Sequence, residues 1–323
     1  MNGFERQQES LSTYAVRTEI DPSNNFDDDS LKQERKKAIW KVLNSAVIYF
    51  LSLNLLAALF DKYIQDKGIL MIVIVSLSML IITFFIGRDK LPMMKKEYKY
   101  EFGISDFFFF FGLTFILSFV FNIITQILMN IFNISSIDVT QILQSSTSPS
   151  IAIYAIIVGP ILEEVQYRGY YVNHLRKYGL YMSVIVSAFI FALSHMNFLQ
   201  GIGTLGIGLV LSYIGYAYSF KAAAIIHIAN NLFTMIIGQF LPDELVMESI
   251  SIPLLITILF MYGLMLYSLV NLFLSKRKAR RRENLKMTEL DKSSLKALFT
   301  DVYFIIYAIA VIAIAIILGS AEL

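Results

Sequence analysis

Two adjacent glutamates and an arginine end an otherwise apolar stretch near the middle of the chain. Glu163 and Glu164 follow the apolar run, and Arg168 lies four residues after Glu164. Residues at i and i+4 share a helix face, so Glu164 and Arg168 can neutralise each other. Glu163 points about 100° away from Glu164 at 3.6 residues per turn. We therefore expect Glu164 and Arg168 to form a structural pair and Glu163 to be free for chemistry; the alternative is a solvated helix end in the headgroup region.

Two of the three histidines lie in hydrophobic segments. His195 comes late in one segment, and His227 shares a helix face with Asn231 in another. A lone histidine in a membrane usually makes hydrogen bonds between helices. Here two histidines, an asparagine and a spare glutamate occur on three separate segments that contain few other polar groups. We expect these side chains to satisfy one another by converging.

Such a cluster is suited to the hydrolysis of an amide bond. A carboxylate and an imidazole can hold and deprotonate a water molecule, and a second imidazole and an amide can donate hydrogen bonds to an oxyanion. Glu163, His195 and His227 are alternatively a three-ligand set for catalytic Zn²⁺. The chain has no cysteine, which excludes disulfides, thiolate metal sites and a cysteine nucleophile. No serine-hydrolase motif is found, so direct attack by water is favoured.

The composition indicates an all-α, polytopic helical membrane protein. Of the 323 residues, 56% are hydrophobic and 16% are charged, whereas soluble domains have roughly 45–50% apolar and 25% charged residues. The net charge of +2 does not indicate nucleic-acid binding, because the basic residues are concentrated between apolar segments. The polar, acidic N-terminus is not a cleavable secretory signal.

The hydropathy pattern predicts about nine transmembrane helices. They cover residues 39–60, 68–86, 107–132, 151–167, 180–198, 201–220, 222–240, 252–274 and 302–318. Five glycines in the sixth span are expected to allow close helix packing. The basic loops place the N-terminus in the cytosol and the C-terminus outside. The most basic loop, 276–282, is interpreted as a topology determinant, with anionic lipid binding as the alternative.

The chain divides into five parts. We expect a disordered cytosolic tail at 1–37, two transmembrane helices and a basic loop at 38–104, a catalytic core at 105–275, a basic cytosolic loop at 276–301, and a last transmembrane helix at 302–323. The predicted end of the fourth span at 167 places Glu163 roughly 6 Å from the cytosolic edge of the membrane, at 1.5 Å per residue. The predicted start of the fifth span at 180 places His195 roughly 20 Å from the same edge. For the two side chains to meet, the fourth helix must extend, tilt or kink at Pro160.

The ordered motifs resemble those of the CPBP family, which includes the type II CAAX prenyl endopeptidases and the bacteriocin-processing or Abi-type intramembrane proteases. The motifs are Glu163-Glu164-x-x-x-Arg168, Phe191-x-x-x-His195 and His227-x-x-x-Asn231. The resemblance covers about residues 105–275 and implies an eight-helix-type core.

The resemblance also implies a role for each motif residue. Glu163 would be the base that activates water, with assistance from His195. His227 and Asn231 would stabilise the oxyanion, and Glu164 and Arg168 would be the structural pair. The resemblance leaves a zinc-dependent and a metal-free mechanism open, and an asparagine at 231 in place of a good metal ligand favours the oxyanion role.

The favoured function is an intramembrane endopeptidase in a bacterial plasma membrane. Its partners would be membrane lipids and a peptide, protein or lipidated precursor reached from the cytosolic side, such as a bacteriocin or pheromone precursor. The alternative is a non-catalytic bacteriocin immunity protein or signalling scaffold that binds a membrane-protein partner. A transporter is a third reading, but it predicts inverted repeats that the hydropathy pattern does not contain.

Overall fold

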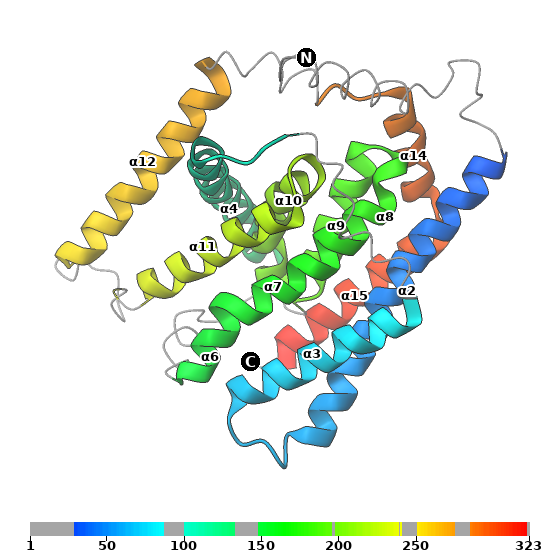
Figure 1. The fold of residues 1–323 in the computed structure, drawn as a ribbon, viewed down its shortest axis with the longest axis horizontal. Helices are drawn as coiled ribbons and strands as arrows, with labels where there is room; N and C mark the ends of the chain where they lie inside the picture. Colours follow the sequence, from blue (N-terminus) through cyan, green and yellow to red (C-terminus); the bar gives the residue numbers. More distant parts are fainter. Residues whose placement is uncertain are drawn as a thin grey trace, which may run out of the picture.

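The computed structural model is all-helical, which confirms the predicted fold class (Figure 1). It describes residues 29–86, 100–132, 148–195, 198–238, 240, 251–274 and 285–321. The longer helices are α2 (Asp29–Phe60), α3 (Lys67–Ile86), α4 (Ile104–Phe132), α9 (Leu180–Leu193), α10 (Phe198–Ala217), α11 (Phe220–Gly238), α12 (Ile252–Leu274), α14 (Glu289–Thr300) and α15 (Val302–Ala321). Between α4 and α9, a composite helix consists of α6 (Pro149–Ile153), η3 (Tyr154–Val158), α7 (Gly159–Glu164), η4 (Val165–Val172), α8 (Asn173–Leu175) and η5 (Arg176–Tyr178).

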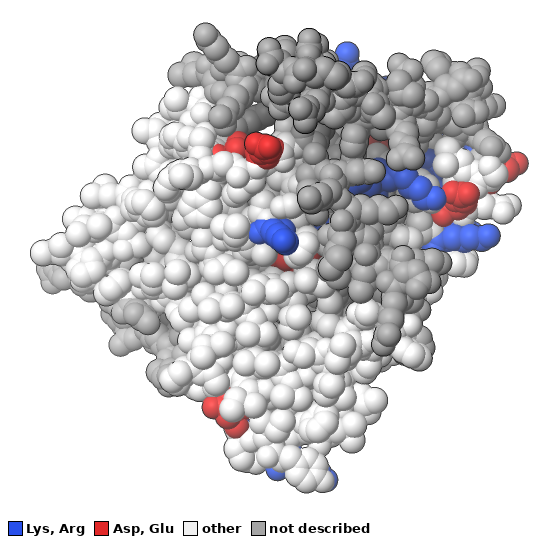
Figure 2. All heavy atoms as spheres, viewed as in Figure 1, with Lys and Arg blue, Asp and Glu red and all other residues white. Residues whose placement is uncertain are grey.

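The helices are those of a multi-pass membrane protein. Within the described residues, six helices are long and apolar enough to cross a membrane, or seven if α14 and α15, which meet at 61°, form one span. Two further apolar helices, Leu180–Leu193 and Gly201–Ala217, are shorter. Each of the nine predicted spans corresponds to one of these helices, and a full crossing by the two short ones remains a prediction. Most of the face in Figure 2 is uncharged, as contact with lipid requires.

The composite helix Pro149–Tyr178 carries both glutamates through the middle of the molecule (Figure 1). The predicted end of this span at residue 167 was wrong, because η4 buries its polar side chains against other helices. Glu163 precedes Tyr178 by 15 residues, and His195 follows Leu180 by 15 residues. Both therefore lie about 22 Å from the turn at Gly179, at 1.5 Å per residue. The difference in depth calculated from the predicted boundaries disappears.

The two larger of the three apolar clusters in the described residues join most of the helices. One joins α2, η4, α9 and α15, and the other joins α4, α10, α11 and α12. Helix α10 packs against both α9 and α4, and glycines on two of its faces permit this. A Cβ atom on Gly208 would lie 3.0 Å from Phe191 Cδ1 of α9, and a Cβ atom on Gly206 would lie 2.9 Å from the Leu117 backbone of α4. On the same helix, a Cβ atom on Gly215 would lie 2.6 Å from Arg168 Cγ of η4. The predicted close packing of this glycine-rich helix is confirmed.

Asp66 connects the start of α3 to the start of the composite helix. Its carboxylate accepts a hydrogen bond from the Ile69 backbone N–H at 2.9 Å and others from the hydroxyls of Ser150 and Ser148. The Ser150 hydroxyl and the backbone donors hold the pKa of Asp66 below its ordinary value, because they stabilise the ionised form.

Two predicted irregular segments contain helix. Residues 29–37, assigned to the disordered tail, are the first turns of α2, where Arg35 and Ala38 are buried against other helices. Residues 289–300, assigned to the basic loop, form α14, which begins with a capping box between Thr288 and Asp291. Residues 1–28 of the tail and the basic stretch 276–282 lie outside the described residues.

Candidate active site

A buried ion pair joins Glu164 and Arg168 on the composite helix. Arg168 Nη1 donates to Glu164 Oε1 at 2.6 Å, and both side chains are 0% exposed. Arg168 Nη2 donates to the Gly208 carbonyl of α10 at 3.1 Å, and the guanidinium lies over the Phe191 ring, 4.5 Å from its centroid. The i,i+4 contact expected from the sequence is therefore formed. Because an unpaired buried charge is strongly destabilising, each of these two groups depends on the other.

His227 of α11 makes the third contact of this cluster. Its Nδ1 lies 2.8 Å from Glu164 Oε1, and the residue is 5% exposed. A carboxylate oxygen is an acceptor, so Nδ1 carries the proton. In the neutral ring the lone pair is then on Nε2. Glu164 thereby fixes both the orientation and the tautomer of the imidazole, because the hydrogen bond at one ring nitrogen decides which nitrogen carries the proton.

Glu163 is the accessible acid of the site. Its side chain is 26% exposed, and Oε2 lies 3.7 Å from His227 Nε2. This separation is longer than a direct N–H···O hydrogen bond, and one water molecule can bond to both atoms at once. The carboxylate that is free of the ion pair is thus the one beside the basic nitrogen of His227.

His195 occupies the end of α9. Its Nδ1 lies 3.0 Å from the Phe191 carbonyl, so this ring also carries its proton on Nδ1 when neutral. The ring packs edge-on against Phe191 at 5.0 Å between centroids. The Phe191 ring is also 5.7 Å from the His227 ring. Phe191, which the sequence identified only as part of a motif, therefore lies between the two histidines and under Arg168.

Asn231 has a structural contact that the sequence did not predict. Its Nδ2 donates to the Ala155 carbonyl of η3 at 2.8 Å. In the i+5 pattern of a π-helix, the donor to this carbonyl would come from residue 160. Residue 160 is a proline and has no N–H. The Asn231 amide thus supplies the missing hydrogen bond, which leaves its second N–H for any oxyanion role.

The environment of Glu163 is rich in tyrosine. Tyr49 of α2, Tyr154 of η3 and Tyr167 of η4 lie within electrostatic range of its carboxylate. Ser187 of α9 donates to the Tyr167 carbonyl at 2.9 Å, which ties α9 to η4 beside the site. The acid therefore lies among tyrosines from α2 and from the composite helix.

The zinc set offered by the sequence does not assemble in this geometry. In the part of the chain that the structure describes, no group of three or more His, Cys, Asp or Glu side chains is placed to hold a metal ion. Glu163 and His227 approach each other, whereas His195 is oriented by the Phe191 carbonyl. The donors present therefore form a carboxylate–imidazole pair.

Comparison with known proteins points to the part of the chain that contains this cluster. Residues 145–233 match the family described as Type II CAAX prenyl endopeptidase Rce1-like. No curated protein and no solved structure matches the chain. The matched segment contains every residue of the cluster: Glu163, Glu164, Arg168, His195, His227 and Asn231. The predicted family resemblance is confirmed, and residues 145–233 of this membrane protein are an Rce1-like domain of the type II CAAX prenyl endopeptidase (CPBP) family.

Proposed function

We propose that the protein is an intramembrane endopeptidase in which Glu163 and His227 together activate a water molecule. The observation that carries this proposal is the 3.7 Å separation between an accessible carboxylate and an imidazole whose other nitrogen is held by a buried carboxylate. This arrangement provides a base, an orienting group and a fixed tautomer, which are the requirements for general acid–base catalysis. The family domain supports a peptide bond as the target.

The reaction follows from the positions of these groups. Glu163 removes a proton from the water that it shares with His227, and the water oxygen forms a bond to the carbonyl carbon of the peptide. The carbonyl oxygen becomes the oxyanion of a tetrahedral intermediate. When the intermediate collapses, the C–N bond breaks and the proton passes to the leaving nitrogen. The products are a carboxylate and an amine.

The charges of the cluster also allow a proton to move between Glu163 and His227. Glu163, Glu164 and Arg168 together carry one excess negative charge when both acids are ionised. A single proton, on either Glu163 or His227, makes the site neutral. Since net charge is costly inside a membrane protein, a proton that moves between these two groups leaves the total charge of the site unchanged.

We assign His227, rather than His195, as the imidazole beside Glu163. His227 is the histidine whose basic nitrogen approaches the acid, and Glu164 holds it in that orientation. His195 Nε2 is then the second polar group on the Phe191 side of the site, and we assign it, as the second N–H donor of the protonated ring, to the oxyanion or the leaving group. Asn231 has one N–H available for the same purpose, because the other is bonded to Ala155.

We propose a peptide or lipidated precursor as the substrate, reached from the cytosolic side. The basic loops of the sequence support a cytosolic N-terminus, and a lipid-embedded site suits a substrate that is itself held in the bilayer. Bacteriocin and pheromone precursors are the candidates that the family resemblance suggests. A bacterial plasma membrane is the location that this substrate class implies.

The test is peptidomics of the membrane fraction from cells that express the wild type or Glu163→Gln. This variant removes the base and keeps the side-chain shape, so we expect cleavage to fall by about 10²–10⁴-fold. Glu289→Gln, on an exposed side chain of α14, is the matched control and should cleave normally. Equal peptide profiles for the wild type and Glu163→Gln would overturn the proposal. An immunity or signalling phenotype that persists in Glu163→Gln would support the scaffold function.

A further inference from the structure

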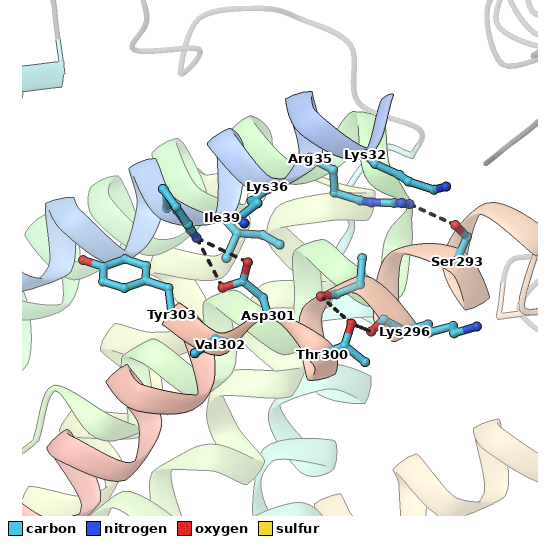
Figure 3. Close-up of a pocket in the computed structure, with 12 residues that line it drawn as sticks. Lys32, Arg35, Lys36, Ile39, Ser293, Lys296, Thr300, Asp301, Val302 and Tyr303 are labelled. Atoms are coloured by element: carbon cyan, nitrogen blue, oxygen red, sulfur yellow. Dashed lines mark hydrogen bonds between the residues drawn. The ribbon is translucent and has the colours of Figure 1, made fainter. Parts of the chain in front are cut away.

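A cavity lies outside the family domain, between the start of α2, helix α14 and the first turn of α15. Its volume is about 490 Å³, and the residues that line it are drawn in Figure 3. Four basic side chains line it: Lys32, Arg35, Lys36 and Lys296. None of the residues of the glutamate site lines this cavity, so it requires a separate explanation.

The basic side chains outweigh the single acid in the lining. Arg35 is 2% exposed, and its Nη1 donates to the hydroxyls of Ser293 and Ser294 at 3.1 and 3.2 Å. Asp301 is the acid, and it accepts hydrogen bonds from Trp40 Nε1 at 3.2 Å and from the Phe304 backbone N–H at 2.9 Å. These donors stabilise its charge at the start of α15. Four cations and one carboxylate line the cavity, and Lys32 also pairs with Asp29 Oδ1 at 3.4 Å. With both acids counted, two positive charges remain in excess around the cavity.

Helices α2 and α15 leave the hydrocarbon region of the membrane at the level of this cavity. In α2 the last charged residue is Lys41, and residues 42–60 contain no Asp, Glu, Lys or Arg. This uncharged part is about 28 Å long, close to the hydrocarbon thickness of about 30 Å. In α15 the uncharged part begins at Val302, directly after the bend from α14. The cavity is therefore at the depth of the lipid headgroups.

The wall of the cavity changes from polar to apolar in the direction of the membrane. The basic residues and Ser293 belong to the first turns of α2 and to α14, whereas Trp40 and Tyr303 lie beside the start of the uncharged parts. The rings of Trp40 and Tyr303 are 5.4 Å apart and meet edge-on, and Lys36 Nζ lies 4.8 Å from the Trp40 ring centroid. Tryptophan and tyrosine are typical of the membrane–water interface. The cavity thus offers cations to a headgroup and aromatic surface to the beginning of an acyl chain.

We propose that this cavity binds the phosphate of an anionic phospholipid from the leaflet where α2 begins. Phosphate oxygens match the guanidinium, ammonium and hydroxyl donors of the lining. Soluble phosphate shares this chemistry, but it would leave the apolar side of the cavity uncovered. A bound lipid would hold α2 against α14 and α15, all of which lie outside the family domain.

The single tryptophan of the chain reports on this site, because Trp40 lines the cavity. The full-length protein is reconstituted in vesicles that contain a minor share of either brominated phosphatidylglycerol or brominated phosphatidylcholine, and quenching of Trp40 fluorescence is measured. The ratio of the two quenching values gives the enrichment of the anionic lipid. We expect Lys296→Gln and Lys36→Gln each to lower this enrichment about fivefold.

Lys37→Gln is the matched control, since Lys37 is an exposed neighbour of Lys36 at the same depth but does not line the cavity. Its enrichment should stay close to that of the wild type. A wild-type ratio of one, or an equal loss in Lys37→Gln, would overturn the proposal, because either result reduces the effect to surface charge. In a second arm, inorganic phosphate is compared with chloride at matched ionic strength. Retention of the lipid preference supports the lipid site, and its abolition would assign the cavity to soluble phosphate.

Discussion

Removal of either partner of the buried ion pair should destabilise the protein strongly, and removal of both should cost less than the two single losses added together. In Arg168→Met the stem that packs against Gly215 is largely retained, but the Glu164 carboxylate keeps its charge at 0% exposure with His227 as its remaining donor. An uncompensated charge of this kind costs about 3–5 kcal/mol. Glu164→Gln has the same shape as the wild type and leaves the Arg168 guanidinium unpaired, so we expect a loss of the same size.

The double variant Glu164→Gln/Arg168→Met removes both charges and leaves no unpaired ion. Its loss of unfolding free energy should be smaller than the sum of the two single losses, by up to about 3 kcal/mol, which is the coupling range for residues in contact. Trp40 lies on α2, away from this pair, so its fluorescence reports unfolding of the whole bundle. Titration of the purified protein from a mild detergent into sodium dodecyl sulfate, followed by this fluorescence and by circular dichroism, gives the free energies.

An exposed ion pair of the same chain is the control. Lys67 Nζ lies 2.6 Å from Asp61 Oδ1 in the connection between α2 and α3, with side chains 62% and 56% exposed. Because water screens this pair, Asp61→Asn and Lys67→Met should each change the stability by at most about 1 kcal/mol. Losses at Glu164 and Arg168 that are this small, or that simply add in the double variant, would refute the interpretation of the cluster as a buried, mutually dependent pair.

Three further predictions concern the supports of the site. Gly215→Ala should destabilise the bundle by about 1–3 kcal/mol through overpacking, whereas Gly263→Ala, which meets no atom within 4 Å, should leave the unfolding midpoint unchanged. Asn231→Leu should cost about 1–3 kcal/mol, because it leaves a backbone carbonyl unsatisfied, and Pro160→Ala in that background should recover part of the loss by restoring an N–H. The pKa of Asp66 is lowered in the folded state, so its carboxylate stabilises the fold at pH values above its unfolded-state pKa. This contribution is lost as the pH falls through the lowered pKa. The unfolding midpoint should therefore depend less steeply on pH in the acid range in Asp66→Asn than in the wild type.

Local periodicity explains which parts of the site could be predicted from the sequence. The Glu164–Arg168 contact depends only on the i,i+4 spacing of one helix, and the structure forms it. The positions of the apolar helices can be predicted because a helix that crosses a membrane needs a long run of consecutive apolar residues. The long-range contact between His227 and Glu164 joins residues 63 positions apart, and no spacing within one helix encodes it. The family resemblance implies His195 as the partner of Glu163, whereas the structure places His227 Nε2 3.7 Å from Glu163 Oε2.

The missed helices have a common physical cause. The polar residues after 167 and in 289–300 predict solvent-exposed segments, but in the structure their side chains have protein partners. Asp291 caps α14 through Thr288 and also accepts a hydrogen bond from the Tyr181 backbone N–H at 3.2 Å. The capping box is a sequence signal that could have located the start of α14. The extension through η4 has no comparable local signal, because its burial depends on α2, α9 and α10.

The two adjacent glutamates show how burial assigns different roles to identical residues. At 3.6 residues per turn their side chains diverge by about 100°, so only one of them can face the seam formed by α10 and α11. Glu164 faces that seam, where Arg168 and His227 both bond to its Oε1. Glu163 faces the accessible side and approaches only the far nitrogen of His227. A Glu164→Ala/Arg168→Ala protein that still folds should therefore lose activity as well, since the His227 tautomer would no longer be fixed, whereas a purely structural pair would leave cleavage by the folded fraction intact.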